Sequence, residues 1–373
     1  MGEIGESFIG LTYKPTDVVS EGGLIVFRSS NIQNGCMDYK DIVRVNKNVK
    51  EKLITKKDDL LVCARNGSAR LIGKNAILHE IDANQTFGAF MMVFRSDINH
   101  FVHQLLNTRL YSSQVSENLG ARINQITSSD LSSFEFFFPK ENSEMNKIAA
   151  LLDLLDERIA TQNKIIDKLQ SLIKGINQRV FMNSGTNYKL GEICEIRNGY
   201  SGSQHLSKKG LKVSRIETIS GHKVNTERVG YVAPFESSEN YRLRVGDILF
   251  SNINSVEYIG NTAFIDKDYD LYHGMNLLRL TPNNMVVIPF YLYLLLNTNR
   301  MLNRFKTVCN KAVSQASINQ TELGKTVVQI PDINAQKQIC ELYQALYDKL
   351  ESEKYANSLF QKQKQYLLRQ MFI

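Results

Sequence analysis

Hydrophobic positions follow a heptad rhythm in one long stretch of the chain, from residue 143 to residue 181. Turn residues disappear there, and apolar side chains recur at alternating steps of four and three. The series is Ile148, Leu152, Leu155, Ile159, Gln162, Ile166, Leu169, Ile173, Ile176 and Val180. Only Gln162 is polar, and such spacing is typical of a coiled coil. We therefore predict a single helix, roughly 58 Å long at about 1.5 Å per residue.

A second stretch, residues 334–373, repeats this rhythm 191 positions later. The series is Ile339, Tyr343, Leu346, Leu350, Glu353, Asn357, Phe360, Lys364, Leu367 and Met371. Glu353 stands where Gln162 stands in the first series, as a shared register requires. Burying one large apolar side chain is worth about 1.5–3 kcal/mol, so neither helix should stay alone in water. We predict an antiparallel pair; the alternative is two amphipathic helices that each pack on their own domain.

The regions before the two helices also resemble each other. The letters LLNT at 105–108 recur at 295–298, GEI at 2–4 recurs at 191–193, and IGKNA at 72–76 is echoed by IGNTA at 259–263. Residues 125–139 line up with residues 317–331. A repeat of this length indicates two similar domains, because the repeats of solenoids are about 20–50 residues long.

Short apolar runs separated by turn signals predict strands in both regions. The predicted fold is α+β, with two β-rich domains related by pseudo-two-fold symmetry and joined by two long antiparallel coiled-coil helices. The predicted boundaries are 1–142 for the first domain, 143–183 for the first helix, 184–333 for the second domain and 334–373 for the second helix.

Composition narrows the class of protein. The 373 residues suffice for two domains, and 43% hydrophobic with 22% charged residues is typical of a soluble globular protein. No apolar run is long enough for a membrane span, and no signal peptide is visible at the start. Five scattered cysteines without CxxC spacing indicate reduced thiols in a cytoplasmic protein, and we expect no metal site.

The net charge of +7 favours a polyanionic partner, but its distribution weakens that argument. Residues 1–142 hold 16 Lys and Arg against 16 Asp and Glu, and residues 190–333 hold 16 against 13. The rest of the excess lies in the helical segments. A nearly neutral domain can still bind DNA if it places a few cations on one face.

Candidate DNA contacts in the first domain gather around a predicted turn. The apolar run 60–64 is followed by the turn dipeptide Asn66-Gly67, and apolar residues resume at position 71. Arginine suits bidentate contacts with guanine or phosphate, and asparagine suits adenine. The candidates are Tyr13, Lys14, Arg28, Arg65, Asn66, Ser68, Arg70 and Gln125.

The matching stretch of the second domain, residues 250–255, carries asparagines but no arginine, so the two domains should prefer different bases. The candidates are Ser203, Arg215, Asn252, Asn254, Gln315 and Ser317. Polar residues near helix starts are equally typical of caps and turns. We assign that structural role to Thr127 and Ser128, which precede a helix at Leu131.

Motifs for catalysis are missing. The chain has no Pro-Pro pair, so the Asn/Asp-Pro-Pro-aromatic signature of amino-methyltransferases cannot be present. Glu-x-Lys does not occur, so a PD-(D/E)xK nuclease core is missing in its usual form. The glycines near Lys74 and Lys325 do not have the spacing of a phosphate loop, and no GxSxG motif occurs. The sequence therefore contains no motif that predicts catalytic activity.

The whole chain resembles the specificity (S) subunits of type I restriction–modification systems. The resemblance rests on GLTY at 10–13, FRSSNI at 27–32, CARNGS at 63–68 with IGK at 72–74, NQI at 124–126, and the helix opening KIA at 147–149 with its repeat QI at 338–339. Each motif is loose, but their duplicated order with two heptad helices is specific. Unlike many relatives, the sequence begins at the opening of its repeat.

The resemblance implies a non-catalytic subunit of a DNA adenine methyltransferase and endonuclease complex. It implies that each domain reads one half-site of a bipartite double-stranded DNA sequence, and that the helices set the unread spacer. Two methyltransferase subunits would dock with S-adenosylmethionine, and restriction subunits would add ATP and Mg²⁺. This chain itself would bind no cofactor and no membrane.

Three alternatives remain open at this point. The first is that the chain is the specificity component of a combined restriction–methylation enzyme, which the absence of a fused catalytic domain disfavours. It can also be an enzyme with unrecognised chemistry, or a coiled-coil assembly protein that binds no DNA.

Overall fold

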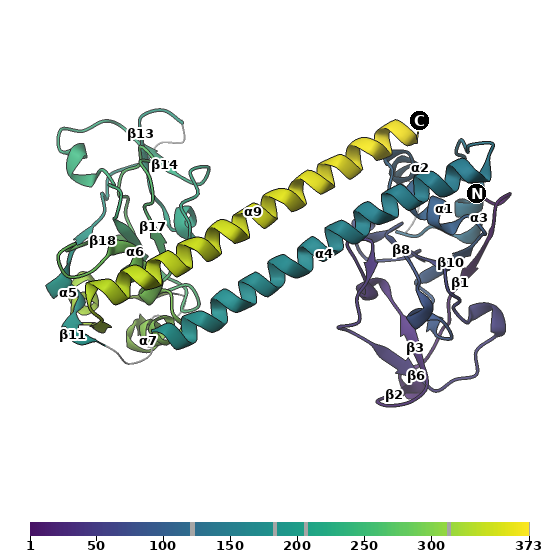
Figure 1. Ribbon diagram of the computed structural model, residues 1–373, viewed down its shortest axis with the longest axis horizontal. Coiled ribbons are helices and arrows are strands. Elements are labelled where there is room, and N and C mark those ends of the chain that lie inside the picture. Colours follow the sequence, from purple (N-terminus) through teal and green to yellow (C-terminus); the bar gives the residue numbers. More distant parts are fainter. Residues whose placement is uncertain (120–123, 182–184, 205–207, 312–314, 373) are drawn as a thin grey trace. The chain divides into compact units, whose positions relative to one another are not determined.

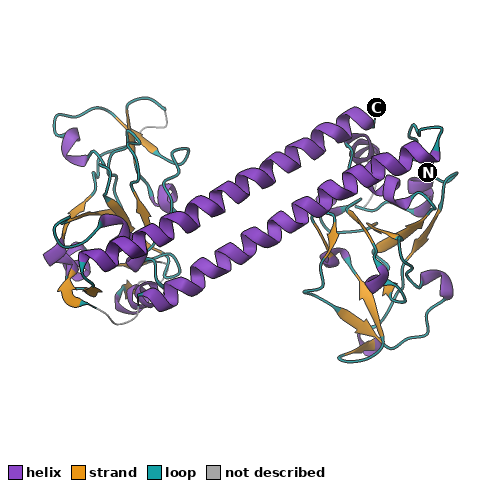
Figure 2. Cartoon of the chain, viewed as in Figure 1, coloured by secondary structure: helices purple, strands orange, loops and turns teal. Residues whose placement is uncertain are grey.

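Two compact units make up the chain in the computed structural model, which describes residues 1–119, 124–181, 185–204, 208–311 and 315–372. The first unit combines Met1–Lys164 with Lys354–Ile373, and the second is Ile165–Glu353. Each unit contains one β-rich domain and parts of both long helices, α4 (Asn142–Val180) and α9 (Ile333–Met371) (Figures 1 and 2). No helix in the described part of the chain is both long and apolar enough to cross a membrane.

The first unit is built on an antiparallel sheet of order β1-β10-β7-β8. Its strands are β1 (Glu6–Ile9), β10 (Met91–Arg95), β7 (Leu60–Cys63) and β8 (Asn75–Ile77). Successive side chains of a strand point to opposite faces. Leu60 and Val62 therefore pack with the helices, whereas Leu61 and Cys63 pack with Phe27 of a second sheet. All four residues of β7 are buried, which explains its continuous apolar run.

Helices and a second sheet cover the two faces of this central sheet. The helices are α1 (Asn99–Leu105), α2 (Arg109–Leu119) and α3 (Ser128–Ser133). The second sheet is β2 (Val18–Val19), β6 (Val43–Val45), β3 (Leu24–Phe27) and β9 (Thr86–Phe87), and beside it lies the hairpin β4 (Ile32–Gln33) and β5 (Cys36–Met37).

The second unit repeats this plan with a sheet of order β12-β18-β15-β17. Its strands are β12 (Cys194–Asn198), β18 (Leu277–Pro282), β15 (Ile248–Ser251) and β17 (Thr262–Phe264). Its helices are α5 (Leu190–Ile193), α6 (Pro289–Leu296), α7 (Asn299–Val308) and α8 (Gln320–Gly324). The smaller pairings join β11 (Thr186–Lys189) with β21 (Val327–Ile330), β13 (Leu211–Val213) with β14 (Gly230–Val232), and β16 (Ile253–Asn254) with β20 (Ala316–Ser317) and β19 (Asn310–Lys311).

The internal repeat is confirmed at the level of single hydrogen bonds. The hydroxyl of Thr108 donates to the Leu105 carbonyl at 2.7 Å, and that of Thr298 donates to the Leu295 carbonyl at 2.8 Å. Gly73 and Gly260 have φ of +80° and +83°, a left-handed conformation that favours glycine. The repeated letters therefore mark equivalent local structures.

The two long helices pack antiparallel within each unit. In the first unit, Asn357 donates to Asn163 at 2.9 Å and Lys364 pairs with Asp156 at 2.5 Å, so numbers fall along α9 as they rise along α4. In the second unit, Tyr343 of α9 donates to Asn177 of α4 at 2.7 Å. All twenty heptad positions are buried or half-buried, which confirms the predicted helices and their apolar series.

The sequence-based prediction of a tight turn at Asn66-Gly67 is wrong. Strands β7 and β8 are antiparallel neighbours, as expected, but a longer connection with a 3-10 helix at Ala69–Leu71 joins them. The Asn66 side chain explains the difference. It donates to the Ser29 hydroxyl at 3.0 Å and accepts the Ser68 amide at 3.0 Å, which holds the chain away from a two-residue turn.

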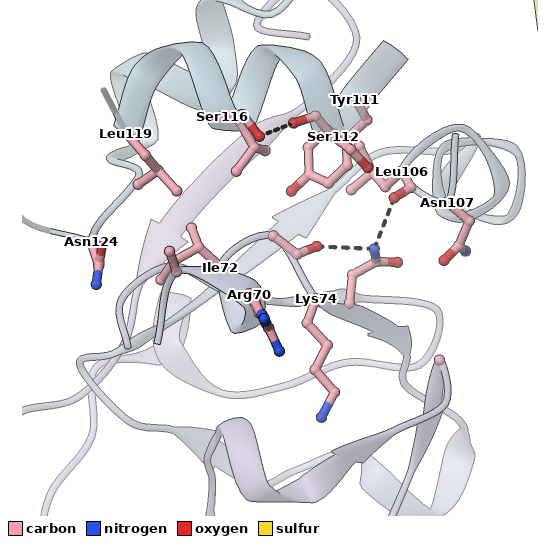
Figure 3. A pocket seen from close by; sticks show the side chains of 15 residues that line it. Arg70, Ile72, Lys74, Leu106, Asn107, Tyr111, Ser112, Ser116, Leu119 and Asn124 are labelled. Atoms are coloured by element: carbon pink, nitrogen blue, oxygen red, sulfur yellow. Dashed lines mark hydrogen bonds between the residues drawn. The ribbon is translucent and has the colours of Figure 1, made fainter. Parts of the chain in front are cut away.

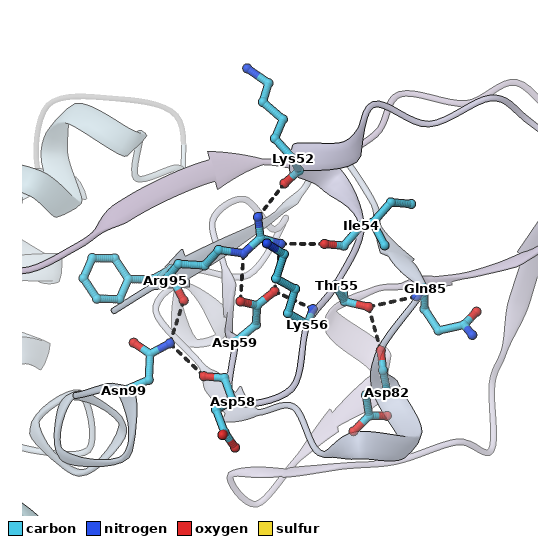
Figure 4. Close-up of polar contacts among 11 residues, drawn as sticks. Lys52, Ile54, Thr55, Lys56, Asp58, Asp59, Asp82, Gln85, Arg95 and Asn99 are labelled. Carbon is cyan, nitrogen blue, oxygen red and sulfur yellow. Dashed lines mark hydrogen bonds and ion pairs between the residues drawn. The ribbon is translucent and has the colours of Figure 1, made fainter. Parts of the chain in front are cut away.

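A buried ion pair joins the end of β10 to the loop before β7 (Figure 4). Arg95 donates from Nε to Asp59 Oδ1 at 2.8 Å and from its Nη2 to Asp59 Oδ2 at 2.9 Å. Asp59 also accepts the Lys56 amide at 2.8 Å, and its side chain is only 4% exposed. The planar guanidinium thus meets the carboxylate through two parallel bonds, the strongest arrangement available to this pair.

Candidate nucleic-acid interface

The loop that follows β7 lies against the segment that precedes α3. Arg65 forms an antiparallel bridge with Gln125, and the Ile126 amide donates to the Ala64 carbonyl at 2.8 Å. The Asn124 side chain donates to the Gly67 carbonyl at 3.0 Å. Two segments that are about sixty residues apart in the sequence are thus held together by backbone and amide bonds. We call the surface formed by Arg65, Asn66, Gln125 and Phe90 the first loop surface.

Arg65 supplies the positive charge of this surface. Its side chain is exposed, and it forms no ion pair with any residue that the structure describes. Its guanidinium lies 5.2 Å from the centre of the Phe90 ring, and its amide donates to the Phe90 carbonyl at 3.0 Å. An arginine held over an aromatic ring retains its free N–H groups for base edges or phosphates.

Phe90 was not predicted from the sequence. Its side chain is 58% exposed, and its ring lies under the Arg65 guanidinium. One signal was present in the repeat, because Phe90 stands one residue before β10, whereas Asn276 stands one residue before β18. Because the equivalent position in the second unit holds the polar Asn276, the hydrophobic core does not require an aromatic side chain at position 90.

The other candidates of the first domain have varied surroundings. Arg28 forms an ion pair with Asp41 at 2.7 Å, so its charge is already compensated. Tyr13 packs partly against the small cluster that contains Leu11, and Lys14 is exposed at the start of a 3-10 helix. Ser68 is exposed beside Asn66, and Arg70 lies in the wall of a neighbouring cavity (Figure 3).

The second unit has the same backbone pairing with different side chains. Ile253 pairs with Ser317, and the Ile318 amide donates to the Asn252 carbonyl at 2.9 Å. These bonds match those of Arg65, Gln125 and Ile126, so Ile253 occupies the place of Arg65 and Ser317 that of Gln125. The equivalence inferred from the sequence between Gln125 and Ser317 is therefore correct.

Asn252 and Asn254 differ in exposure. Asn252 is only 9% exposed and lies at the place of Ala64, below the surface, so it is less suited to a DNA contact than the sequence suggested. Asn254 is half-buried; it donates to the Ser251 hydroxyl at 3.0 Å and accepts the Ser255 amide at 2.8 Å. Gln315 is exposed.

Ser203 and Arg215 come together at a separate cavity of 440 Å³ in the second unit. Gln204 and Asn276 also line it. The Arg215 Nε donates to Gln204 Oε1 at 2.6 Å, and the guanidinium remains exposed. Arg215 has the same local backbone as Arg28, since both amides donate to the side chain three residues later.

Other polar residues near these surfaces are the N-caps of helices. Thr127 accepts the Asp130 amide at 3.1 Å and caps α3, as the sequence predicted. Asn319 accepts the Glu322 amide at 2.8 Å and caps α8 in the same way. These side chains stabilise helix starts and are poor candidates for DNA contacts.

The cysteine below the first loop surface is a poor nucleophile. All five are free, and burial raises the pKa of Cys63, directly below the first loop surface, to about 11. Burial likewise raises the pKa of Cys194 to about 12. A thiol with such a pKa carries almost no thiolate at neutral pH and is a poor nucleophile.

Comparisons with known proteins give one consistent family. The model of the type I restriction modification DNA specificity domain matches residues 1–171 and again 184–358. The EcoKI specificity subunit of Escherichia coli K12 is 27% identical over 376 residues, which cover 91% of this chain and 79% of that protein. The putative MjaX specificity subunit of Methanocaldococcus jannaschii is 44% identical over 158 residues, 41% of this chain and 37% of that protein.

A crystal structure with the same fold is the S subunit of a type I restriction–modification system from M. genitalium. It has a TM-score of 0.64 and 17% sequence identity, and the match covers 100% of this chain and 94% of that one. The repeat seen in the letters, in the sheets and in single hydrogen bonds is thus a repeat of one domain type. The chain belongs to the type I restriction-modification DNA specificity family, as a specificity subunit with two such domains.

Proposed function

We propose that the chain reads a bipartite DNA sequence, with one half-site for each domain. The observation that supports this most strongly is the paired loop of the two units. The backbone bonds are the same, but Arg65 and Gln125 in the first unit are replaced by Ile253 and Ser317 in the second. Two equivalent surfaces with different side chains suit the recognition of two different short sequences.

We further propose that the chain is non-catalytic and works in the cytoplasm within a larger complex. Two methyltransferase subunits would dock on it and bring S-adenosylmethionine, and restriction subunits would bring ATP and Mg²⁺. The helices α4 and α9 would set the distance between the half-sites. The lack of catalytic motifs and the raised thiol pKa values near the first loop surface support a role in binding rather than chemistry.

The test is to sequence the methylome of a host that carries this chain with its methyltransferase. We expect methylated adenines in a two-part motif with a fixed unread spacer. The purified chain alone should show neither methyl transfer nor cleavage. Methylation at a single continuous motif, or activity of the isolated chain, would contradict the proposal, and the latter would favour a combined enzyme or unrecognised chemistry.

Replacing Arg65 with alanine should weaken binding of the parent DNA by about 1–3 kcal/mol and relax the choice of one base in one half-site. The reason is the loss of a guanidinium that is held at Phe90 and free to contact a base edge. The measurement is a competition assay with every single-base variant of the site.

Arg65→Lys is the matched control, because lysine keeps the charge but cannot form two parallel bonds to guanine. We expect the lysine variant to lose discrimination at the same base as the alanine variant. If lysine restores full binding, or if alanine weakens all sequences equally, Arg65 contacts a phosphate and not a base.

A further inference from the structure

A cavity of 680 Å³ lies in the first unit between α2 and the segment that follows β7 (Figure 3). Tyr111, Val115 and Leu119 of α2 form one wall, with their side chains directed toward Ile72. Arg70 lies in the opposite wall. Ser112 and Ser116 of α2 also line the cavity, so the helix side is mixed in polarity, and the opposite edge is cationic.

The charge of this cavity is uncompensated. Arg70 and Lys74 both line it, and no Asp or Glu occurs among its lining residues in the described part of the chain. Neither cation forms an ion pair with a described residue. Two positive charges without a carboxylate favour an anionic ligand, and a guanidinium with an ammonium is a common pair for phosphate.

The second unit differs in the side chains at the equivalent positions, although an aromatic ring packs against the glycine in both units, Tyr111 on Gly73 and Phe305 on Gly260. Tyr111 and Met301 are equivalent, since both amides donate to the threonine hydroxyl three residues earlier at 3.3 Å. Four residues later, Val115 is therefore matched by Phe305, which is fully buried. The Phe305 ring lies so close to Gly260 that a Cβ there would be 2.6 Å from it.

The cations are also specific to the first unit. Lys74 and Asn261 are equivalent, since their carbonyls accept the amides of Cys63 and Ser251 at 2.8 Å. By the same alignment, Glu257 stands where Arg70 stands. The two cations that line the cavity are thus replaced by an amide and a carboxylate at the equivalent positions of the second unit.

A buried hydroxyl in the wall lacks a partner. Tyr111 is 2% exposed, and its hydroxyl makes no hydrogen bond with any described residue. Burial raises the pKa of Tyr111, so the hydroxyl keeps its proton. A buried donor without an acceptor is uncommon, but this oxygen is covered by neighbouring atoms, so the ligand is inferred from Arg70 and Lys74.

We propose that this cavity binds a phosphate group through Arg70 and Lys74. Its position indicates the source of that phosphate, because Asn124 lines the cavity and also donates to the Gly67 carbonyl of the loop that carries Arg65. A DNA backbone phosphate beside the half-site of the first domain is thus the expected ligand, an assignment that rests on the proposed function. A free phosphate or a nucleotide offers the same chemistry from another source.

Inorganic phosphate is the probe for the site itself, titrated into the full chain at constant ionic strength. Methyl NMR signals of Ile72, Val115 and Leu119 should shift and saturate. The shifts should vanish in the double variant Arg70→Ala/Lys74→Ala and in Val115→Phe, which places a larger side chain in the wall of the cavity. Unchanged methyl signals in the wild-type chain overturn the proposal, whether or not the chain recognises DNA.

The source is decided with parent DNA in which single phosphates are replaced by neutral methylphosphonates. One replacement should weaken DNA binding by the wild-type chain but not by the double variant. The slope of the logarithm of the DNA-binding constant against the logarithm of the salt concentration should be smaller by about 1 in the double variant. If phosphate saturates the cavity but no DNA position behaves this way, the ligand is a free phosphate or nucleotide. Loss of base discrimination in Arg70→Ala alone, with an unchanged salt slope, overturns the phosphate role of Arg70.

Discussion

Removal of one heptad from both long helices, residues 160–166 and 354–360, should make the chain select half-sites that lie about three base pairs closer together. Seven residues span about 10 Å of helix, and each base-pair step rises about 3.4 Å. The paired deletion keeps the register of the antiparallel helices. It removes both Asn163 and Asn357, which are bonded to each other, and it keeps the ion pair of Asp156 with Lys364. Binding to the parent site should be lost almost completely.

The control is deletion of residues 160–166 alone. It shifts one heptad series against the other and separates apolar side chains that are worth about 1.5–3 kcal/mol each when buried. We expect it to lower stability and to abolish binding at every spacing. Selection from a library of spacer lengths is the measurement. An unchanged spacer preference in the paired deletion would show that the helices do not determine the distance between half-sites.

Asp59→Ala should destabilise the first unit by about 3–5 kcal/mol, because it leaves the Arg95 guanidinium largely buried without its carboxylate. That is a large part of the stability of an ordinary domain. The Arg95 side chain is 18% exposed and cannot turn fully into water. Hydrogen exchange of the β10 amides, followed as denaturant is added, reports the change within this unit.

The second unit provides the matched control. Asp247 accepts the Arg244 amide as Asp59 accepts the Lys56 amide, both at 2.8 Å. Its other partner is the neutral Thr281 hydroxyl at 2.6 Å, so Asp247→Ala leaves no buried charge. We expect a smaller loss of about 1–3 kcal/mol. Equal losses in the two units would show that the charge of Arg95 contributes little.

Much of the fold was predictable because its signals are periodic or repeated. The heptad series gave both long helices within a few residues, and the duplicated letters marked equivalent bonds such as those of Thr108 and Thr298. The connection after β7 was not predictable. It depends on the contact between Asn66 and Ser29, and no local pattern reveals a partner 37 residues away.

The candidate site was predictable only in part. Residue type and position in the repeat marked Arg65 and Gln125 as candidates, but they did not predict the backbone bridge between the two. The same reasoning cannot tell a free arginine from one that is already paired, as Arg28 is with Asp41. It also cannot reveal a cavity, since that volume depends on how side chains from distant segments, such as Arg70 and Val115, pack around it.

The backbone bonds that hold the first loop surface have an evolutionary consequence. The pairing of residue 65 with residue 125, like that of residue 253 with residue 317, needs no particular side chain at either position. Substitutions there change what the surface presents while the scaffold keeps its folding energy. Under the proposed function, new target preferences would arise by drift at a few exposed positions, without a compensating change elsewhere in the domain.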